Sequence, residues 1–247
     1  MTTEFDDPTG YGRIIRNVTK EVIKIIEEKD AAEHIKKIKE VNTGIYCLNW
    51  SKIRNAFYDL KNNNAQGEYY LTDIVKWARD NSLTVLGYKN PDNQETFGIN
   101  SRKHLAIAAK IMNMRHMEEL MEQGVTIVDP SSTYISPDTE IGFDTTIFPN
   151  CYVEGKNKIG NKCKIGPMAH IRGNCEVGDE SKIGNFVEIK NAKIAKNSNV
   201  CHLTYIGDAK IGSRVNIGAG TIFANYNSIT KEKKMSTVAD GASIGSN

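Results

Sequence analysis

His202 is the side chain in this sequence best suited to acid–base chemistry. It lies in the segment HLTYIGD, where the regular spacing of aliphatic residues around it is interrupted. An imidazole with an ordinary pKa of about 6.5 can accept a proton close to neutral pH, as a general base must. The alternative interpretation is a polar residue that faces solvent.

Arg172 and Lys190 form a second candidate group. They lie eighteen residues apart, so in a coil with eighteen residues per turn they would stack on one face. Two stacked cations repel each other unless an anion lies between them, and a phosphate dianion fits because arginine can bind it in a bidentate manner. Two solvated surface charges are the alternative. His170 has no motif around it and is interpreted as a surface residue.

The five cysteines form no CxxC pair, although three of them are evenly spaced: Cys47, Cys151, Cys163, Cys175 and Cys201. Each of the three spaced thiols follows a repeat-defining aliphatic residue by four positions, as Ala169, Ser181 and Val187 do. A separation of twelve residues is two thirds of an eighteen-residue turn, which would place the three thiols on different faces. We therefore predict small-residue packing rather than a metal cluster.

A six-residue repeat must position these side chains. Aliphatic residues recur every six positions from Ile135 to Ile189, from Ile194 to Ile206 and from Ile211 to Ile217, and one five-residue step separates each run from the next. This period fits neither an amphipathic helix nor an alternating strand. It is typical of a left-handed parallel β-helix with three short strands per turn, in which each aliphatic residue points inward and stacks on its equivalent one turn later. Val238 and Ile244 are still in register near Asn247, so we expect an open C-terminal edge.

The composition excludes several classes of protein. The net charge is only +2 and no basic stripe is interleaved with aromatic residues, so a nucleic-acid partner is not expected. No apolar run approaches about 18 residues, the length of a membrane span, and the polar, acidic start MTTEFDDPTGYG is no signal peptide. We expect a cytoplasmic protein.

Residues 1–128 predict a mixed α/β domain that precedes the coil at 129–247. Strands are expected at 12–16, 21–27, 43–48 and 83–88, and helices after Ser51, Thr72 and Ser101, with these three residues as N-caps and Gly124 at a helix end. Alternating strands and helices favour a sheet with helices packed against it. The Gly-rich loop that opens a nucleotide-binding sheet is absent before Asp6. The residues thus predict an α/β domain that lacks its opening part, followed by a β-solenoid.

Six motifs resemble one protein family, in the same order and over essentially the whole chain: DDPTGYGRIIR (6–16), EVNTGIY (40–46), NNNAQGEYYLTD (62–73), IGNFVEIK (183–190), HLTYIGDA (202–209) and NIGAGTIFANY (216–226). The family is the bacterial bifunctional N-acetylglucosamine-1-phosphate uridylyltransferase and glucosamine-1-phosphate N-acetyltransferase. Its members make UDP-N-acetylglucosamine for peptidoglycan and lipopolysaccharide. The resemblance implies a Rossmann-like domain that uses Mg²⁺ and UTP, and a trimeric β-helix that uses acetyl-CoA.

The resemblance also implies roles for individual residues. On the coil, His202 would be the general base that deprotonates the sugar amine. The sugar phosphate and the rest of that substrate would be bound by Arg172, Lys190, Tyr205 and Asn216, and acetyl-CoA by Ala219, Asn225, Tyr226 and Ser246. In the first domain, the sugar nucleotide would be bound by Gly12, Glu27, Asn42 and Asn100, of which Asn100 would also be a Mg²⁺ ligand.

The sequence departs from the family pattern at several points. The Gly-rich loop, the Asp that is the other Mg²⁺ ligand and the last part of the coil are missing. Gly173 stands where the family usually has proline, Asn227-Ser228 replace Asp-Gly, and the loop that follows is longer, which leaves the partner of Lys231 or Lys233 undefined. We therefore interpret the chain as an internal fragment, opened at Met1 and cut at Asn247. We expect no uridylyltransferase activity and at best weak acetyltransferase activity.

Two other functions compete with this interpretation. The first is a non-catalytic remnant that only forms a trimer through its coil. The second is a metal-dependent coil enzyme of the carbonic anhydrase kind, which needs three converging histidines. Only His170 and His202 lie on the coil, so this second alternative is disfavoured.

Overall fold

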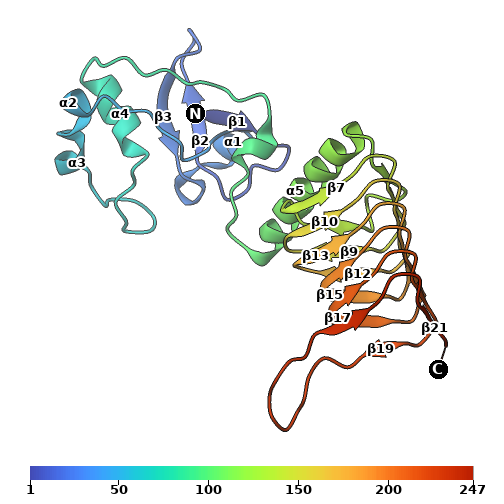
Figure 1. Ribbon diagram of the computed structural model, residues 1–247. Coiled ribbons are helices and arrows are strands. Elements are labelled where there is room, and N and C mark those ends of the chain that lie inside the picture. Colours follow the sequence, from blue (N-terminus) through green and yellow to red (C-terminus); the bar gives the residue numbers. More distant parts are fainter. Residues whose placement is uncertain (247) are drawn as a thin grey trace. The chain divides into compact units, whose positions relative to one another are not determined.

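The computed structural model describes residues 1–246 and divides into two compact units, Met1–Leu105 and Ala106–Asn247 (Figure 1). The predicted boundary between residues 128 and 129 lies after the long helix α5 (Arg102–Glu122), whereas the compact units separate within it. The predicted boundary stays a prediction. None of the helices in the described residues combines the length and the apolar character needed to cross a bilayer.

The first unit is built on a four-stranded sheet. Its strands are β1 (Thr2–Glu4), β2 (Arg13–Arg16), β3 (Val22–Ile26) and β4 (Glu40–Asn42), in the order β1-β4-β2-β3, and every pair is antiparallel. The helices are α1 (Glu33–Lys36), α2 (Trp50–Ile53), α3 (Ala56–Asp59) and α4 (Asp73–Asp80), with 3₁₀ turns η1 (Glu28–Asp30) and η2 (Asn93–Thr96). The described residues therefore show a sheet with helices, as expected, but not the parallel sheet of a Rossmann-like domain.

Two of the four predicted strands in this unit are wrong. Segments 43–48 and 83–88 have no regular strand structure, and the nearest ladder contact is a single bridge between Thr2 and Lys89. Leu83 and Val85 still pack against the apolar core, whereas Leu86 and Tyr88 are exposed. The alternation is thus real, but no neighbouring strand pairs with it. The strands at 12–16 and 21–27 are confirmed as β2 and β3.

The predicted helix caps also differ in part. Ser101 accepts a hydrogen bond from the backbone N–H of His104 (3.1 Å), and Gly124, with φ +91°, follows the end of α5; both predictions are confirmed. Ser51 lies inside α2 rather than before it. Thr72 precedes α4, but its hydroxyl makes no cap hydrogen bond and instead donates to Glu27 (2.8 Å).

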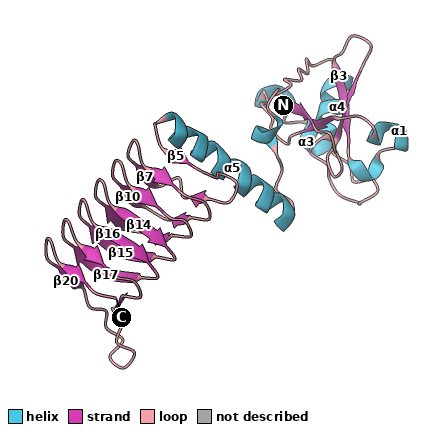
Figure 2. Ribbon diagram, turned by 90° about the vertical axis from the view of Figure 1, so that its right-hand side faces the viewer, coloured by secondary structure: helices cyan, strands magenta, loops and turns pink. Residues whose placement is uncertain are grey.

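The second unit is a parallel β-helix with three faces, which confirms the predicted coil (Figures 1 and 2). The first face contains β6 (Tyr134–Ile135), β9 (Tyr152–Glu154), β12 (His170–Arg172) and β19 (Ile222–Phe223). The second contains β7 (Thr139–Ile141), β10 (Asn157–Ile159), β13 (Cys175–Val177) and β20 (Ser236–Val238). The third contains β5 (Thr126–Ile127), β8 (Thr146–Ile147), β11 (Lys164–Ile165), β14 (Lys182–Asn185), β16 (Asn199–His202), β18 (Asn216–Ile217) and β21 (Ser243–Ile244).

Two longer strands belong to both the first and the second face. They are β15 (Glu188–Ile194) and β17 (Tyr205–Ile211), and each contains one of the five-residue steps in the aliphatic repeat. Losing one residue at the corner shortens it, so the strand continues from one face to the next. The turn length falls accordingly from eighteen residues between Ile171 and Ile189 to seventeen between Ile189 and Ile206.

The core of the coil consists of the inward aliphatic columns and the small residues at the corners. Cys151, Cys163 and Cys175 are free, buried thiols in this core, which confirms their predicted packing role. Burial raises the pKa of each of these three thiols. A thiol with a raised pKa is a poor nucleophile and metal ligand at neutral pH, which fits structural residues.

Helix α5 closes one end of the coil from Ala106 onward (Figures 1 and 2). Met117 and Leu120 are buried among the first inward residues of the coil. Asn113 completes the contact, because its side-chain amide donates to the carbonyl of Thr133 (2.9 Å) and accepts from the N–H of Ile135 (3.1 Å). The helix therefore pairs with backbone groups at this end that would otherwise lack partners.

The corners of the coil adopt left-handed backbone conformations. The corner between the third and first faces has φ between +46° and +60° at Asn150, Met168, Phe186 and Leu203. The other two corners carry mostly Asn and charged residues at the equivalent positions, such as Asn174, Asn191, Asp208, Lys162, Glu180 and Asn197. Asn and Asp tolerate this conformation, whereas bulky apolar residues rarely adopt it. The apolar corner is therefore the unusual one.

Candidate functional site

Arg172 and Lys190 lie side by side on the first face, as predicted. They are in-register partners on β12 and β15, and Gly207 on β17 is the next residue in this column. Their relation to anions differs from the prediction, because two carboxylates of the chain already lie beside Arg172. Its Nη1 donates to Glu188 (2.9 Å), and its Nε lies 3.6 Å from Glu154.

A shallow pocket adjoins this pair. It is lined by Glu154, Gly155, Arg172, Gly173, Asn174 and Lys190. Gly155 and Gly173 line it in successive turns, and a Cβ atom on Gly155 would lie 3.1 Å from the Cα of Gly173. The glycine at 173 thus leaves room where the resemblance leads one to expect a proline ring.

Tyr205 and Asn225 converge at the next turn of the same face. Tyr205 is the in-register neighbour of Glu188. A Cβ atom at Gly207 would collide with the Tyr205 hydroxyl and would lie 2.6 Å from the Asn225 amide nitrogen. Glycine is therefore required at 207 for both side chains to hold these positions, and they lie one turn from Lys190.

His202 begins a second column of candidate residues, at the corner between the third and first faces. Its in-register neighbour on one side is Asn185. Turn lengths in this region are seventeen residues between Val200 and Ile217 and 27 residues between Ile217 and Ile244, which brings Ala219 and then Ser246 into the same column. In agreement with this register, the backbone N–H of Gly218 donates to the carbonyl of Ile244. The backbone nitrogen of Ser246 lies close to the position that a Cβ atom of Gly218 would take.

The His202 side chain is exposed, and the described residues give its ring no hydrogen-bond partner. Its carbonyl accepts a hydrogen bond from the hydroxyl of Thr204 (2.7 Å), which ties down the backbone of the corner. The imidazole is thus available to a ligand. Asn216, on β18, is exposed on the third face two turns beyond Lys182.

Tyr226 lies in a hairpin, residues 224–235, that projects from the coil between β19 and β20 (Figure 1). It forms an isolated antiparallel bridge with Lys233 and is about half exposed. The hairpin contains the ten-residue insertion that lengthens one turn from seventeen to 27 residues. Lys233 is thus placed opposite Tyr226, whereas the sequence left its partner open.

Three of the four predicted residues in the first unit lie together. The N–H of Asn42 donates to the carbonyl of Gly12 (2.8 Å), and a Cβ atom at Gly12 would lie 3.2 Å from the Glu27 carboxylate. Asn100 lies next to the position that a Cβ atom of Gly98 would take, and the hydroxyl of Tyr11 lies next to the same position.

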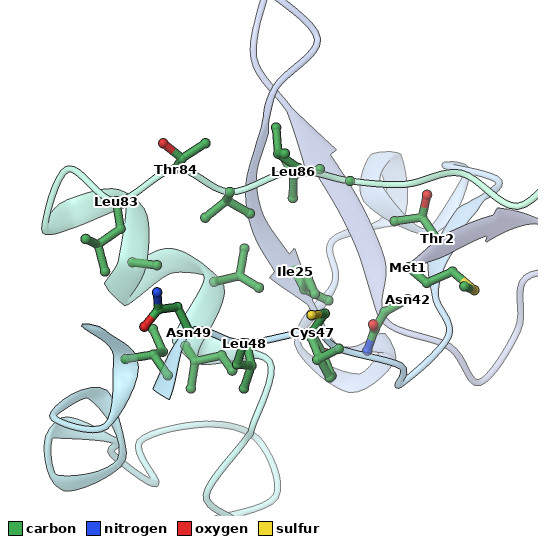
Figure 3. Close-up of a pocket in the computed structure, with 18 of the residues that line it drawn as sticks. Met1, Thr2, Ile25, Asn42, Cys47, Leu48, Asn49, Leu83, Thr84 and Leu86 are labelled. Atoms are coloured by element: carbon green, nitrogen blue, oxygen red, sulfur yellow. The ribbon is translucent and has the colours of Figure 1, made fainter. Parts of the chain in front are cut away.

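A partly apolar pocket extends from Asn42 along the sheet of the first unit (Figure 3). Met1, Thr2, Ile25 and Cys47 line it together with Asn42. Tyr46 also contributes, and burial raises its pKa to about 12. The hydroxyl is therefore protonated at neutral pH and acts as a neutral polar group in this pocket.

The residues present do not fit a magnesium site. Asn100 supplies one amide oxygen, and in the part of the chain that the structure describes no three His, Cys, Asp or Glu side chains are grouped so that they could hold a metal ion. Mg²⁺ is bound in proteins through carboxylates together with substrate phosphates. We therefore derive no step through a metal ion.

Sequence reasoning missed Glu154, Glu188 and Asp208. The first two look like ordinary outward charges of the repeat, and only the cross-strand register shows that they flank Arg172. The sequence contains one indication of the role of Asp208, because Asn191, Asp208 and Asn225 follow one another at intervals of seventeen residues. That spacing equals one turn only after the five-residue steps are taken into account.

Comparison with known proteins agrees with this architecture. A family model described as "Bacterial transferase hexapeptide (six repeats)" matches residues 158–191. The repeat of this chain is thus similar to the hexapeptide repeats of bacterial transferases.

Sequence relatives extend the similarity to the whole chain. The chain is 43% identical to the "Bifunctional protein GlmU" of Brevibacillus brevis and also 43% identical to that of Clostridioides difficile, in both cases over its entire length. The chain is therefore similar to the GlmU proteins over its whole length, which confirms the resemblance found in the motifs. The chain spans about 60% of the length of these relatives.

The solved structures add little to this. A perosamine N-acetyltransferase from Caulobacter crescentus matches with 14% identity, covering 51% of this chain and 61% of its own, at a TM-score of 0.15.

Proposed function

We propose that the coil of this chain catalyses the transfer of an acetyl group from acetyl-CoA to the amine of glucosamine-1-phosphate. The observation that carries the proposal is the arrangement of two columns on adjoining surfaces of the coil. One contains the cations Arg172 and Lys190, and the other contains His202, Ala219 and Ser246. A basic imidazole near an anion-binding pair suits a substrate that carries both an amine and a phosphate.

The cationic column would hold the sugar phosphate. Among the contacts of the described residues, Lys190 has no ion-pair partner, and Arg172 uses Nη1 and Nε for Glu188 and Glu154, which leaves Nη2. A phosphate can therefore bind Lys190 and this free edge of the guanidinium without displacing either carboxylate. Charge-assisted contacts of this kind fix orientation as well as affinity.

His202 would act as the general base. The amine of the sugar is an ammonium ion in water and becomes a nucleophile only when it loses a proton. The exposed imidazole can accept that proton as the nitrogen attacks the thioester carbonyl, and the thiolate of coenzyme A leaves. Tyr205 and Asn216 are proposed to contact the sugar, and Asn225 and Tyr226 the acetyl-CoA.

The product would be N-acetylglucosamine-1-phosphate, a step toward UDP-N-acetylglucosamine, and we place the reaction in the bacterial cytoplasm. Uridylyl transfer is not proposed for this chain. That reaction depends on positioned metal ions and phosphates, whereas Gly12, Glu27 and Asn42 form a polar cluster that could bind a sugar nucleotide without transferring a uridylyl group.

We also propose that the coil assembles as a trimer. The apolar corner supports this, because the side chains of Met168, Phe186 and Leu203 stack in successive turns and are 45%, 58% and 63% exposed. A contiguous apolar stripe on a soluble surface is typical of an interface. Light scattering of the purified chain tests the proposal directly.

Release of free thiol from acetyl-CoA in the presence of glucosamine-1-phosphate tests the activity. His202→Asn should lower kcat by about 10²-fold to 10⁴-fold, the usual contribution of a general base, with little change in KM. Lys190→Ala should raise KM for the sugar phosphate, whereas the matched variant Lys193→Ala, on the second face, should not.

Two results would refute the proposed activity. One is a wild-type chain that forms the trimer but releases no thiol and binds no acetyl-CoA, which would favour the non-catalytic remnant. The other is full activity in His202→Asn.

A further inference from the structure

A buried carboxylate lies at the base of the projecting hairpin. Asp208 lies at the corner between the first and second faces, is 7% exposed and has φ +48°. Asn191 lies one turn before it and Asn225 one turn after it. A carboxylate at such a position must be satisfied by donors, because burying an unpaired charge is costly.

Both asparagines supply those donors. Nδ2 of Asn191 donates to Oδ1 of Asp208 (2.5 Å), and Nδ2 of Asn225 donates to Oδ2. An ionised carboxylate can only accept hydrogen bonds, so each amide has to turn its NH₂ group toward Asp208. The orientation of the Asn225 amide is therefore dictated by chemistry, and its Oδ1 is left as the group available to a ligand.

The groups around Asp208 keep it ionised. The hydrogen bond from Asn191 is the main reason that its pKa lies below the ordinary value, and Asn225, Lys233 and Lys190 contribute in the same direction. Lys233 is part of the hairpin, and Lys190 belongs to the cationic column. Asp208 thus interacts electrostatically with both the hairpin and the cationic column.

The hairpin has little else to hold it. Within 224–235 every residue is exposed except Asn225. Its internal hydrogen bonds, such as those that join Lys234 to Asn225 and Asn227 to Glu232 (both 2.9 Å), shape the hairpin without attaching it to the coil. Its attachment through side chains therefore depends on Asn225 and, through it, on Asp208.

We infer that Asp208 is a positioning residue, which anchors the hairpin 224–235 to the coil through Asn225 and fixes the Asn225 amide as a hydrogen-bond acceptor. The ligand that such an acceptor recognises is an N–H donor. The arm of coenzyme A carries amide N–H groups of this kind. The statement about the ligand rests on the proposed function, whereas the statement about the hairpin does not.

Hydrogen–deuterium exchange of the full chain tests the anchoring. In Asp208→Ala the hairpin amides, such as that of Lys234, should exchange about tenfold faster or more, while the amides of β16 keep their wild-type rates. Asn225→Ala should give the same result from the hairpin side without altering the coil. The matched control Asp179→Ala removes a carboxylate that accepts from Asn161 (2.7 Å) at another corner, and it should leave the hairpin unchanged.

Calorimetric titration with acetyl-CoA tests the positioning. Each single variant should weaken binding by about tenfold, and the double variant should bind no more weakly than Asn225→Ala alone, because Asp208 acts through Asn225. The inference would be overturned if the losses of affinity in the two single variants multiplied in the double variant, or if the exchange rates of the hairpin amides were unchanged in Asp208→Ala. A wild-type chain that does not bind acetyl-CoA would refute the proposed function and the ligand statement, while the exchange experiment would still decide the anchoring.

Discussion

Removing one inward side chain should destabilise the coil far more than removing an outward one on the same face. Ile189 is 0% exposed and stacks between Ile171 and Ile206. Ile189→Ala deletes three carbon atoms, worth about 0.8 kcal/mol each in transfer free energy. The ladder spacing of about 4.8 Å is fixed by backbone hydrogen bonds on both sides, so the cavity cannot collapse and adds its own cost. We expect a loss of about 3.5 kcal/mol in the free energy of unfolding.

Ile222 provides the control, since it lies on the same face but is 69% exposed. Ile222→Ala should cost only about 0.7 kcal/mol, because most of its surface is already in water. Urea unfolding followed by circular dichroism measures both values, and the dependence on urea concentration should be the same in both variants. Equal losses in the two variants, or a loss below about 1.5 kcal/mol for Ile189→Ala, would refute the inward-column argument.

Three further predictions concern assembly, thiols and acid. Replacing Phe186 and Leu203 by Asn should abolish the trimer in light scattering while the circular dichroism spectrum stays that of the wild type. Asn tolerates the left-handed conformation of this corner, which lowers the conformational free-energy cost by about 1 kcal/mol per residue. A persisting trimer would contradict the interface. In native protein Ellman's reagent should modify exposed Cys47 rapidly and buried Cys163 slowly, whereas Cys201 is partly buried; a fast phase that survives when both Cys47 and Cys201 are replaced by serine would be the contrary result. The pKa of Asp208 is lowered by folding, so its stabilising effect is complete above the unfolded pKa of about 3.9 and is lost as the pH falls through the lower folded value. The difference in urea midpoint between wild type and Asp208→Ala should therefore shrink as the solution is acidified from about pH 5 to about pH 2, and a difference that stays constant would argue against it.

The coil could be predicted from sequence because one physical requirement recurs in every turn. Each inward position needs an aliphatic residue of similar size, so the period itself reports the fold, and the eighteen-residue separation of Arg172 and Lys190 predicted their pairing. The first unit lacks such redundancy. Segment 83–88 has the alternation of a strand, but whether it becomes one depends on a partner strand that local sequence does not reveal.

The site was predictable to the extent that it follows the repeat. The surroundings of Arg172 were not, because Glu154 and Glu188 reach it across strands and the sequence gives no direction for a charged side chain. Asp208 was hidden for another reason. An aspartate at a corner looks like an ordinary turn residue, and its two asparagine partners become visible only when the turn length is known to be seventeen.

The one-dimensional stacking of the coil has a consequence for how it comes apart. Each turn touches only the turn before and the turn after it, so cooperativity is passed along the axis from neighbour to neighbour. Helix α5 closes one end with buried residues such as Met117, whereas Val238 and Ile244 at the other end of the described coil are only partly buried. A turn that loses its structure should therefore loosen its two neighbours first, and more distant turns only through them. When the turn of Ala219 is the one that loosens, the proposed acetyl-CoA side is lost while the cationic column of Arg172 is still intact.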